Sequence, residues 1–291
     1  MVTRMRYLAI GAAIPVFALL LAGFLGFLHP AGDSLALLRL PLTALAAIAV
    51  LVLRRPRRLR AGGAALTGLS VASLAIAHCP GAPGPITVYQ RNLWFANPDL
   101  AAIAAEIRHR DPDIVLLQEV SDHTVGLLDT LRADWPAQTF CRFSGWSGIA
   151  VLSRHPMIAG SAQCSDWRGL AAMQIALGGR PVWVGSVHLF WPWPHDQAKQ
   201  RAKPVARIDR MEGPVILGGD FNMVPWSHGV RALARAAGGS VARPALSTRP
   251  VRGMPLPIDH VIAPGGGSAT RLPRQGSDHF GLLARVHLAQ R

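Results

Sequence analysis

The first 80 residues are far more apolar than the rest of the chain, and short polar segments divide them. Residues 7–28 carry no charge and are long enough to cross a hydrocarbon core, which needs about 20 helical residues. Residues 35–53 form a second stretch, with Arg39 near one end, where an arginine can reach the headgroups, and Pro41 suited to a first helical turn. A third stretch, residues 61–77, is shorter and rich in small residues. The pattern predicts a membrane anchor of two to three transmembrane helices over residues 1–78.

The arginines between these stretches predict an orientation. Arg4 and Arg6 precede the first stretch and five arginines lie in residues 54–60, whereas residues 29–34 hold Asp33 and no Lys or Arg. Because loops rich in Lys and Arg stay cytoplasmic, three spans place everything after Cys79 outside the cytoplasm of a multi-pass protein of the cell (inner) membrane. A cleaved signal peptide would account for the first stretch alone. If the third stretch only skims the interface, the C-terminal domain faces the cytoplasm instead.

Residues 79–85, which read Cys-Pro-Gly-Ala-Pro-Gly-Pro, are rich in helix breakers and predict a linker. Beyond the linker, short apolar runs alternate with polar segments through residues 86–291, the predicted C-terminal domain. Several runs are continuously apolar, which is typical of sheets buried on both faces. We expect strands at residues 86–91, 113–118, 148–153, 171–177, 182–188, 215–219, 258–262 and 282–288, and helices at 99–109, 197–211 and 227–237.

Charge adds to this division. The formal net charge is +14, and residues 1–85 contribute half of it through eight arginines and one acid. The C-terminal domain carries the other +7, which favours a polyanionic substrate or an anionic bilayer surface; a charged face that only confers solubility is the alternative.

The three cysteines, Cys79, Cys141 and Cys164, lack the spacing of a metal site. Cys141 and Cys164 are expected in neighbouring strands. In an oxidising compartment they are candidates for a disulfide, with free buried thiols as the default.

Polar residues of metal-binding or acid–base type occur within or directly after apolar runs. A single buried Asp or His is more often a hydrogen-bonded core residue than a ligand. Several in one domain, each with a cost of desolvation, indicate a shared site. The residues are Glu119, His188, Asp220, Asn222, Asp259, Asp278 and His279.

Such an oxygen-rich set suits a hard cation, Mg²⁺ or Mn²⁺, which keeps several waters and binds substrate phosphate. Zinc is a poorer match without a compact set of His or Cys ligands. The corresponding reaction is metal-assisted hydrolysis of a phosphoester, with a histidine supported by an aspartate handling a proton.

The ordered motifs resemble the endonuclease/exonuclease/phosphatase superfamily, which has the deoxyribonuclease-I-like fold. The resemblance covers essentially all of residues 86–291 and is specific in combination, although Gly-Asp-Phe-Asn alone is only suggestive. It implies an α/β (α+β) fold, a four-layer sandwich of two mixed β-sheets flanked by helices, with the site at one end. The motifs are Asn92, Gln118-Glu119, residues 147–154, His188-Leu189, Gly219-Asp-Phe-Asn222, residues 258–260 and Ser277-Asp278-His279.

The resemblance also implies roles. Glu119 would be the principal metal ligand, assisted by Asn92 and Asp278. Asp220 and Asn222 would position the attacking water and the phosphate, while His279, oriented by Asp259, and His188 would contact the scissile phosphate. In-line attack by water is expected. The sequence offers no evident carboxylate partner for His188, which leaves its role as a general acid open.

Fold does not choose a substrate within this superfamily. Trp94, Trp191, Trp193 and Trp226 lie near the motifs and are suited to stacking on bases or meeting lipid, with hydrophobic packing as the alternative. The leading hypothesis is hydrolysis of nucleic acid outside the cytoplasm. Hydrolysis of a phospholipid or other membrane-borne phosphoester follows closely, and a non-catalytic sensor of a phosphorylated ligand is a third possibility. No obligate protein partner is inferred.

Overall fold

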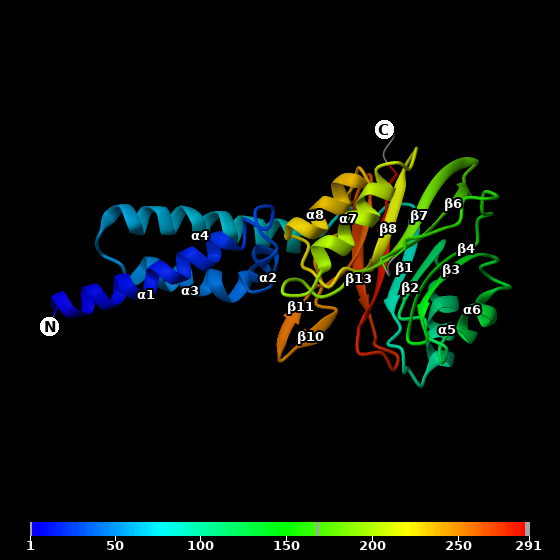
Figure 1. The fold of residues 1–291 in the computed structure, drawn as a ribbon, viewed down its shortest axis with the longest axis horizontal. Coiled ribbons are helices and arrows are strands. Elements are labelled where there is room, and N and C mark those ends of the chain that lie inside the picture. The colour runs from blue at the N-terminus through cyan, green and yellow to red at the C-terminus, as the bar shows by residue number, and fades with distance from the viewer. Residues whose placement is uncertain (1, 167–168, 289–291) are drawn as a thin grey trace.

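The computed structural model of the protein describes residues 2–166 and 169–288 and has a helical N-terminal segment followed by an α/β domain (Figure 1). The helical segment comprises α1 (Val2–Ala22), α2 (Ala31–Leu37), α3 (Arg39–Val52) and α4 (Arg57–His78). Residues 79–85 contain neither helix nor strand. The division into an anchor, a linker and a catalytic domain stays a prediction, but it coincides with these changes in structure.

The helical segment differs from the sequence prediction in its first two stretches. The first helix ends at Ala22, because residues 23–28 form turns that pack closely on α2; a Cβ on Gly26 would lie 2.4 Å from the Asp33 carboxylate. The second stretch breaks at Leu38, where α2 and α3 meet at 76°. The expectation that Arg39 reaches the headgroups is wrong. Its side chain is 1% exposed, donates to the carbonyl of Gly23 at 2.7 Å and lies over the Phe24 ring.

Among the described residues, one helix, α4, is by itself long and apolar enough to cross a membrane. The bent pair α2 and α3 passes the same test only when taken together, and the apolar part of α1, Tyr7–Ala22, is shorter. The best candidate span is therefore α4, which covers the third apolar stretch, residues 61–77, the one that the sequence supports least. A multi-pass arrangement stays a prediction.

The C-terminal domain contains two mixed six-stranded sheets, as predicted. In the first sheet the strand order is β13-β14-β1-β2-β4-β3, and in the second it is β5-β6-β7-β8-β12-β9. Each sheet has one parallel pair, β1 with β2 and β7 with β8. The strands of the first sheet are β1 (Ile86–Asn92), β2 (Ile114–Gln118), β3 (Ala137–Ser144), β4 (Ser147–Ser153), β13 (Gly267–Leu272) and β14 (Gly281–Val286). Those of the second are β5 (Gln163–Cys164), β6 (Leu170–Leu177), β7 (Arg180–His188), β8 (Val215–Asp220), β9 (Ser240–Val241) and β12 (Asp259–Ala263).

Helices cover the two outer faces, which gives the predicted four layers (Figure 1). One buried cluster, which includes Val88, Leu116 and Ile216, fills the space between the sheets. A second lies under α5 (Leu100–Arg110) and α6 (Gly126–Leu131), and a third under α7 (Gln197–Ile208) and α8 (His228–Ala236). A short hairpin, β10 (Arg249–Val251) and β11 (Met254–Leu256), stands apart from both sheets.

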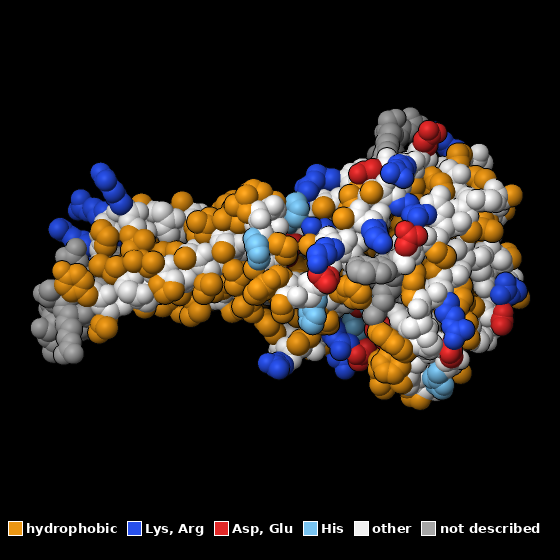
Figure 2. Space-filling model, viewed as in Figure 1, with side chains coloured by type: hydrophobic (Ala, Val, Ile, Leu, Met, Phe, Trp, Pro, Cys, Tyr) orange, Lys and Arg blue, Asp and Glu red, His pale blue; other side chains and the backbone are white. Residues whose placement is uncertain are grey.

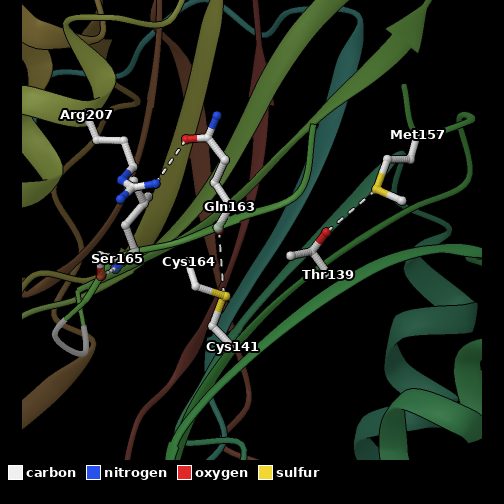
Figure 3. Close-up of a disulfide and its surroundings, with 8 residues drawn as sticks. Thr139, Cys141, Met157, Gln163, Cys164, Ser165 and Arg207 are labelled. Atoms are coloured by element: carbon white, nitrogen blue, oxygen red, sulfur yellow. Dashed lines mark hydrogen bonds between the residues drawn. A yellow bond between two sulfur atoms is a disulfide. The ribbon is translucent and has the colours of Figure 1, made fainter. Parts of the chain in front are cut away.

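Cys141 and Cys164 form a disulfide with Cα atoms 5.6 Å apart (Figure 3). The expectation that they lie in neighbouring strands is wrong, because β3 is the edge of the first sheet and β5 is the edge of the second. The disulfide therefore joins the two sheets. Cys79 is free and exposed.

The helical segment is bonded to the C-terminal domain. Asp33 of α2 is 4% exposed and accepts hydrogen bonds from the backbone N–H groups of His228 (2.7 Å) and Gly229 (3.1 Å), which begin α8. It also pairs with Arg201 of α7 at 3.3 Å. The Trp226 indole donates to the carbonyl of Ala36 at 2.8 Å. These contacts hold the helical segment in a defined position on the domain.

Candidate active site

Strand ends from both sheets meet at one end of the sandwich. The parallel pairing of β1 with β2 sets Asn92 opposite Gln118, directly before Glu119. In the second sheet the pairing of β7 with β8 sets His188 opposite Asp220. Because the carboxyl ends of parallel strands lie at the same sheet edge, the two pairs bring their polar side chains to one place. Asp259, which begins β12, is paired with Asp220 from the other side.

These side chains surround one cleft of about 680 Å³. Asn92 and Asp259 lie deeper and reach the other site residues through hydrogen bonds. The structure thus brings together all eight side chains chosen from the sequence. Six of them line the cleft, namely Glu119, His188, Asp220, Asn222, Asp278 and His279.

Three residues at the cleft have positive φ angles although they are not glycine. Glu119 has φ 54°, Asn222 has φ 48° and Trp94 has φ 61°. Side chains with a Cβ rarely adopt this conformation, and such strain gathers at functional sites. The left-handed turn also places Asn222, which reaches the cleft because the chain turns after Asp220. Its backbone N–H donates to Asp220 at 2.9 Å.

Gly219 allows the close packing behind Asp220. Its φ is 154°, and a Cβ there would lie 1.9 Å from the carbonyl oxygen of Val187 on the neighbouring strand. Any larger residue would push β8 away from β7 and displace Asp220 from the cleft.

A buried polar network that the sequence did not indicate connects the two sheets under the cleft. Gln90 donates to Gln118 at 2.7 Å and to Asp259 at 3.1 Å. Gln118 donates in turn to Ser186 at 2.9 Å. The glutamine side chains are fully buried, so they hold the two sheets, and the site residues on them, in register.

His279 and Asp259 form a buried ion pair in the site. Nδ1 of His279 lies 2.8 Å from the Asp259 carboxylate, and its Nε2 lies 3.7 Å from Asp220. Burial opposes a charge on the imidazole, but Asp259 and Asp220 outweigh it and raise the pKa of His279 to about 9. His279 is therefore an imidazolium at neutral pH, held by Asp259 as expected, with Nε2 toward the cleft.

For Asp220, unlike His279, burial outweighs the attraction of nearby groups and favours the neutral form of the side chain. Burial raises its pKa to about 7, although His279 and the hydrogen bonds from Asn222 and Asn92 act in the other direction. A carboxyl group that titrates near neutrality is suited to accept a proton from water. His188 also approaches this carboxylate, with Nε2 3.7 Å from Asp220 and 3.9 Å from Glu119.

The neighbouring His260 has a structural role. It is 3% exposed, and its Nε2 lies 2.8 Å from the carbonyl of Met223. Burial lowers its pKa to about 4, so the ring stays neutral. Of these two adjacent residues, Asp259 therefore contacts His279 in the site, whereas His260 packs in the core.

The residues proposed to hold the metal fit a hard cation. Glu119 borders the cleft with its carboxylate, and Oδ1 of Asp278 is buried without a hydrogen-bond partner among the described residues. Carboxylate oxygens at the cleft suit Mg²⁺ or Mn²⁺. Asp220, Asp259 and His279 also present ligand atoms within 4.8 Å of one another. We propose Glu119 and Asp278 for the metal instead, because Asp259 and His279 are already bonded to each other at 2.8 Å.

The contacts of Asn92 bear on its predicted role as a metal ligand. The Asn92 amide donates to Glu119 at 3.1 Å and to Asp220 at 3.0 Å, while its oxygen accepts from the Trp94 N–H at 2.9 Å. This arrangement suggests that Asn92 positions the two carboxylates and does not bind the metal directly through its oxygen.

Arg249, at the start of β10, pairs with Asp278 in the cleft. No local pattern marks it, because a hairpin remote from the strand ends delivers it.

The fold and the site together define a divalent-metal-dependent phosphoester hydrolase. A model of the endonuclease/exonuclease/phosphatase family matches residues 92–279, and the chain belongs to this family. The family and the hydrolase class are confirmed, and dependence on a divalent metal goes with the family.

Solved structures share the fold at low sequence identity. An endonuclease/exonuclease/phosphatase family protein from Leptotrichia buccalis is 14% identical with a TM-score of 0.54, over 70% of this chain and 100% of that one. A beta toxin mutant from Staphylococcus aureus with bound magnesium ions is 15% identical with a TM-score of 0.54, over 69% and 99%. Truncated TDP2 from Caenorhabditis elegans is 18% identical with a TM-score of 0.52, over 68% and 96%. A search of curated proteins finds no match.

Proposed function

We propose that the protein is a membrane-tethered phosphodiesterase whose substrate is a phospholipid or another membrane-borne phosphoester. The observation that carries this proposal is the contact between the helical segment and the cleft wall. Ser34 donates to the carbonyl of Trp193 at 2.6 Å, and the His29 and Trp193 rings pack at 6.1 Å. The adjoining residues Trp191, Pro194 and His195 line the cleft. A bilayer around the helical segment would therefore lie close to the active site.

The surface of the helical segment supports its placement in a membrane. Large apolar side chains point outward, and Leu45, Ile48 and Leu51 are 50%, 57% and 78% exposed. The internal contacts are made partly by small residues, such as Ala13 and Ala46. Figure 2 shows this apolar surface along the segment, with Lys and Arg side chains at its far end. Exposed apolar helices with basic ends are typical of membrane spans.

The disulfide supports a location outside the cytoplasm. Disulfides persist in oxidising compartments and are rare where thiols are kept reduced. The bond between Cys141 and Cys164 joins the sheets of the catalytic domain itself. It therefore agrees with the orientation inferred from the arginines.

The charges around the cleft favour a lipid over an extended nucleic acid. Four carboxylates, those of Glu119, Asp196, Asp220 and Asp278, line the cleft, against two cations, Arg249 and the His279 imidazolium. A nucleic-acid groove is normally basic along its length. Two exposed aromatic residues, Phe95 (43%) and Trp193 (50%), belong to the loops of the cleft wall and suit a membrane interface.

Nucleic acid is the second candidate. Trp94 and Trp191 line the cleft beside Glu119 and His188 and are placed to stack on bases. This observation keeps a nuclease activity as the alternative that the experiment must separate. Binding without turnover is the third.

We assign the steps of hydrolysis to the chain's own residues. Glu119 and Asp278 would hold the divalent ion, which would supply positive charge to neutralise the phosphate. Asp220 and Asn222 orient water for in-line attack, and Asp220 accepts a proton. The His279 imidazolium, held by Asp259, and His188 contact the phosphate and stabilise its developing charge. The buried network under the cleft keeps these groups in place before substrate binds.

The test uses the full chain reconstituted in vesicles, assayed with Mg²⁺ against headgroup-labelled phospholipid in the same bilayer, plasmid DNA and RNA. Release of headgroup without DNA nicking supports the proposal, and Glu119→Gln should abolish it. Nicking of DNA without headgroup release would favour the nuclease. If the wild-type chain turns over none of them, the membrane-borne substrate and the nuclease are both rejected in favour of a sensor.

A further inference from the structure

A second cavity, of about 640 Å³, lies where α4 leaves the helical segment and meets α8 and β9. It is separate from the catalytic cleft and shares no lining residue with it. Its walls come from the last turns of α4, the segment before α8, α8 itself and the chain around β9. Most of the lining is apolar, and its members include Ile76, Ala77, Trp226, Ala234, Val241 and Ala245.

One face of α4 runs directly into this cavity. Leu69, Ser73 and Ile76 are spaced four and three residues apart, so they lie on the same side of the helix. Leu69 is 57% exposed and Ile76 is 63% exposed, which leaves an uncovered apolar track. Because α4 is the helix best suited to span a bilayer, the track leads from the hydrocarbon region to the cavity.

Arginines surround the end of the track. Arg231, Arg235 and Arg243 line the cavity, and among the described lining residues none is acidic. A fourth arginine, Arg39, donates to Ser73 on the cavity wall at 3.4 Å. The nearest compensating carboxylate, that of Asp33, is already bound to the start of α8. The apolar cavity therefore has an uncompensated positive rim.

The arginines keep donors for a ligand. Arg231 uses Nε and Nη2 for the carbonyls of Ser227 and Trp226, which leaves Nη1. Arg243 uses Nη1 for the carbonyl of Ile76. Burial and the nearby charge of Arg235 lower the pKa of Arg231, and the carboxylate of Asp33 offsets this only in part. An anion between these guanidinium groups would relieve this repulsion.

We propose that this cavity binds one anionic phospholipid from the surrounding bilayer. The phosphate lies among Arg231, Arg235 and Arg243, and an acyl chain lies along the α4 track over Ile76. The proposal uses the membrane placement of α4 argued above. The lipid is a bound ligand at a second site, separate from the lipid that the cleft would hydrolyse. It would join α4 to α8, the helix that Asp33 already caps.

The experiment measures lipid binding to the full chain, purified and delipidated in detergent, with EDTA present to prevent turnover. Native mass spectrometry compares phosphatidylglycerol with phosphatidylcholine of the same acyl chains. We expect phosphatidylglycerol to bind at least about tenfold more tightly, since both lipids offer a phosphate but the quaternary ammonium of phosphatidylcholine would face Arg231, Arg235 and Arg243 without a carboxylate partner in the lining. Arg231→Gln/Arg235→Gln/Arg243→Gln should remove this preference. Arg235→Gln alone, at an exposed residue, should weaken it without disturbing the fold.

The matched control changes the same charge elsewhere. Arg108→Gln/Arg132→Gln/Arg142→Gln alters exposed ion pairs with Asp134, Asp129 and Asp122 and should leave lipid preference unchanged. Equal binding of the two lipids by the wild type would overturn the proposal. An equal loss of the preference for phosphatidylglycerol in the control variant would overturn it too. The proposal would also be overturned if glycerol phosphate raised the Tm of the protein as much as phosphatidylglycerol does, because the acyl chain would then have no role. Failure of the wild-type chain to float with vesicles would reject the membrane placement of α4 instead.

Discussion

The pair formed by His279 and Asp259 makes the most specific prediction about catalysis. Replacing Asp259 by Asn keeps the size of the side chain but removes the charge 2.8 Å from Nδ1 of His279. The pKa of His279 is about 9 because Asp259 and Asp220 outweigh burial. In the Asp259→Asn variant burial remains and the larger of the two attractions is lost. The pKa of His279 should therefore fall toward its ordinary value of 6.5 or below.

The size of the effect follows from the two pKa values. A raised pKa means that the imidazolium is present at low pH and is lost as the pH rises through about 9 in the wild type. At pH 8 roughly 90% of wild-type His279 is protonated, against roughly 3% for a pKa of 6.5. If the imidazolium is required, kcat/KM at pH 8 should fall by up to about 30-fold from protonation alone. At pH 6 both forms are mostly protonated, and the ratio should approach about one.

The assay is kcat/KM for a soluble phosphodiester between pH 6 and 9.5, with Mg²⁺ saturating at each pH. Wild type should lose activity above about pH 9, and Asp259→Asn should lose it about 2.5 units lower. Asp129→Asn, at an exposed residue that pairs with Arg132, is the control and should follow the wild type. A ratio of wild type to Asp259→Asn that stays constant over this range would show that the charge of His279 is not used.

Further predictions concern the metal, the disulfide and the helical segment. Glu119→Gln should lower kcat by about 10³-fold or more while the circular dichroism spectrum is unchanged, and activity near that of the wild type would remove Glu119 from the metal site. EDTA should abolish activity, and added Mg²⁺ or Mn²⁺ should restore it; activity that persists in EDTA would contradict the metal assignment. Replacing Cys141 and Cys164 by Ser should destabilise the fold by about 2–4 kcal/mol in urea unfolding, and an unchanged midpoint would mean that the bond adds nothing. Asp33→Asn should cost about 1–3 kcal/mol and expose residues 79–85 to protease, whereas unchanged protection would show that this contact does not hold the helical segment.

The local pattern predicted the strands, the helices and sheets buried on both faces, whereas the sandwich was implied by the resemblance to the family. Continuous apolar runs mark buried strands, and the polar residue that ends each run is visible without knowledge of the fold. Once parallel pairs share a sheet edge, residues such as Glu119, His188 and Asp220 must gather.

The features that the sequence missed depend on distant contacts. Arg249 enters the cleft from a hairpin that belongs to neither sheet, and Gln90 resembles any buried strand residue until its partner from the other sheet is known. Asp33 was notable only as the acid of a loop without arginines, yet it caps a helix 195 residues away. Trp226 was grouped with the tryptophans of the site but is 7% exposed and bonded to α2. In each case the partner, and not the residue type, decides the role.

The most direct test of the active site is Mg²⁺-dependent hydrolysis of a phosphodiester by the full chain, compared with single substitutions of Glu119, Asp220 and His279 by Ala. If these side chains form one site, each variant should lose several orders of magnitude in turnover, and any two combined should lose little more than either alone. Losses that multiply when two substitutions are combined, or turnover that survives all three, would contradict a single shared site.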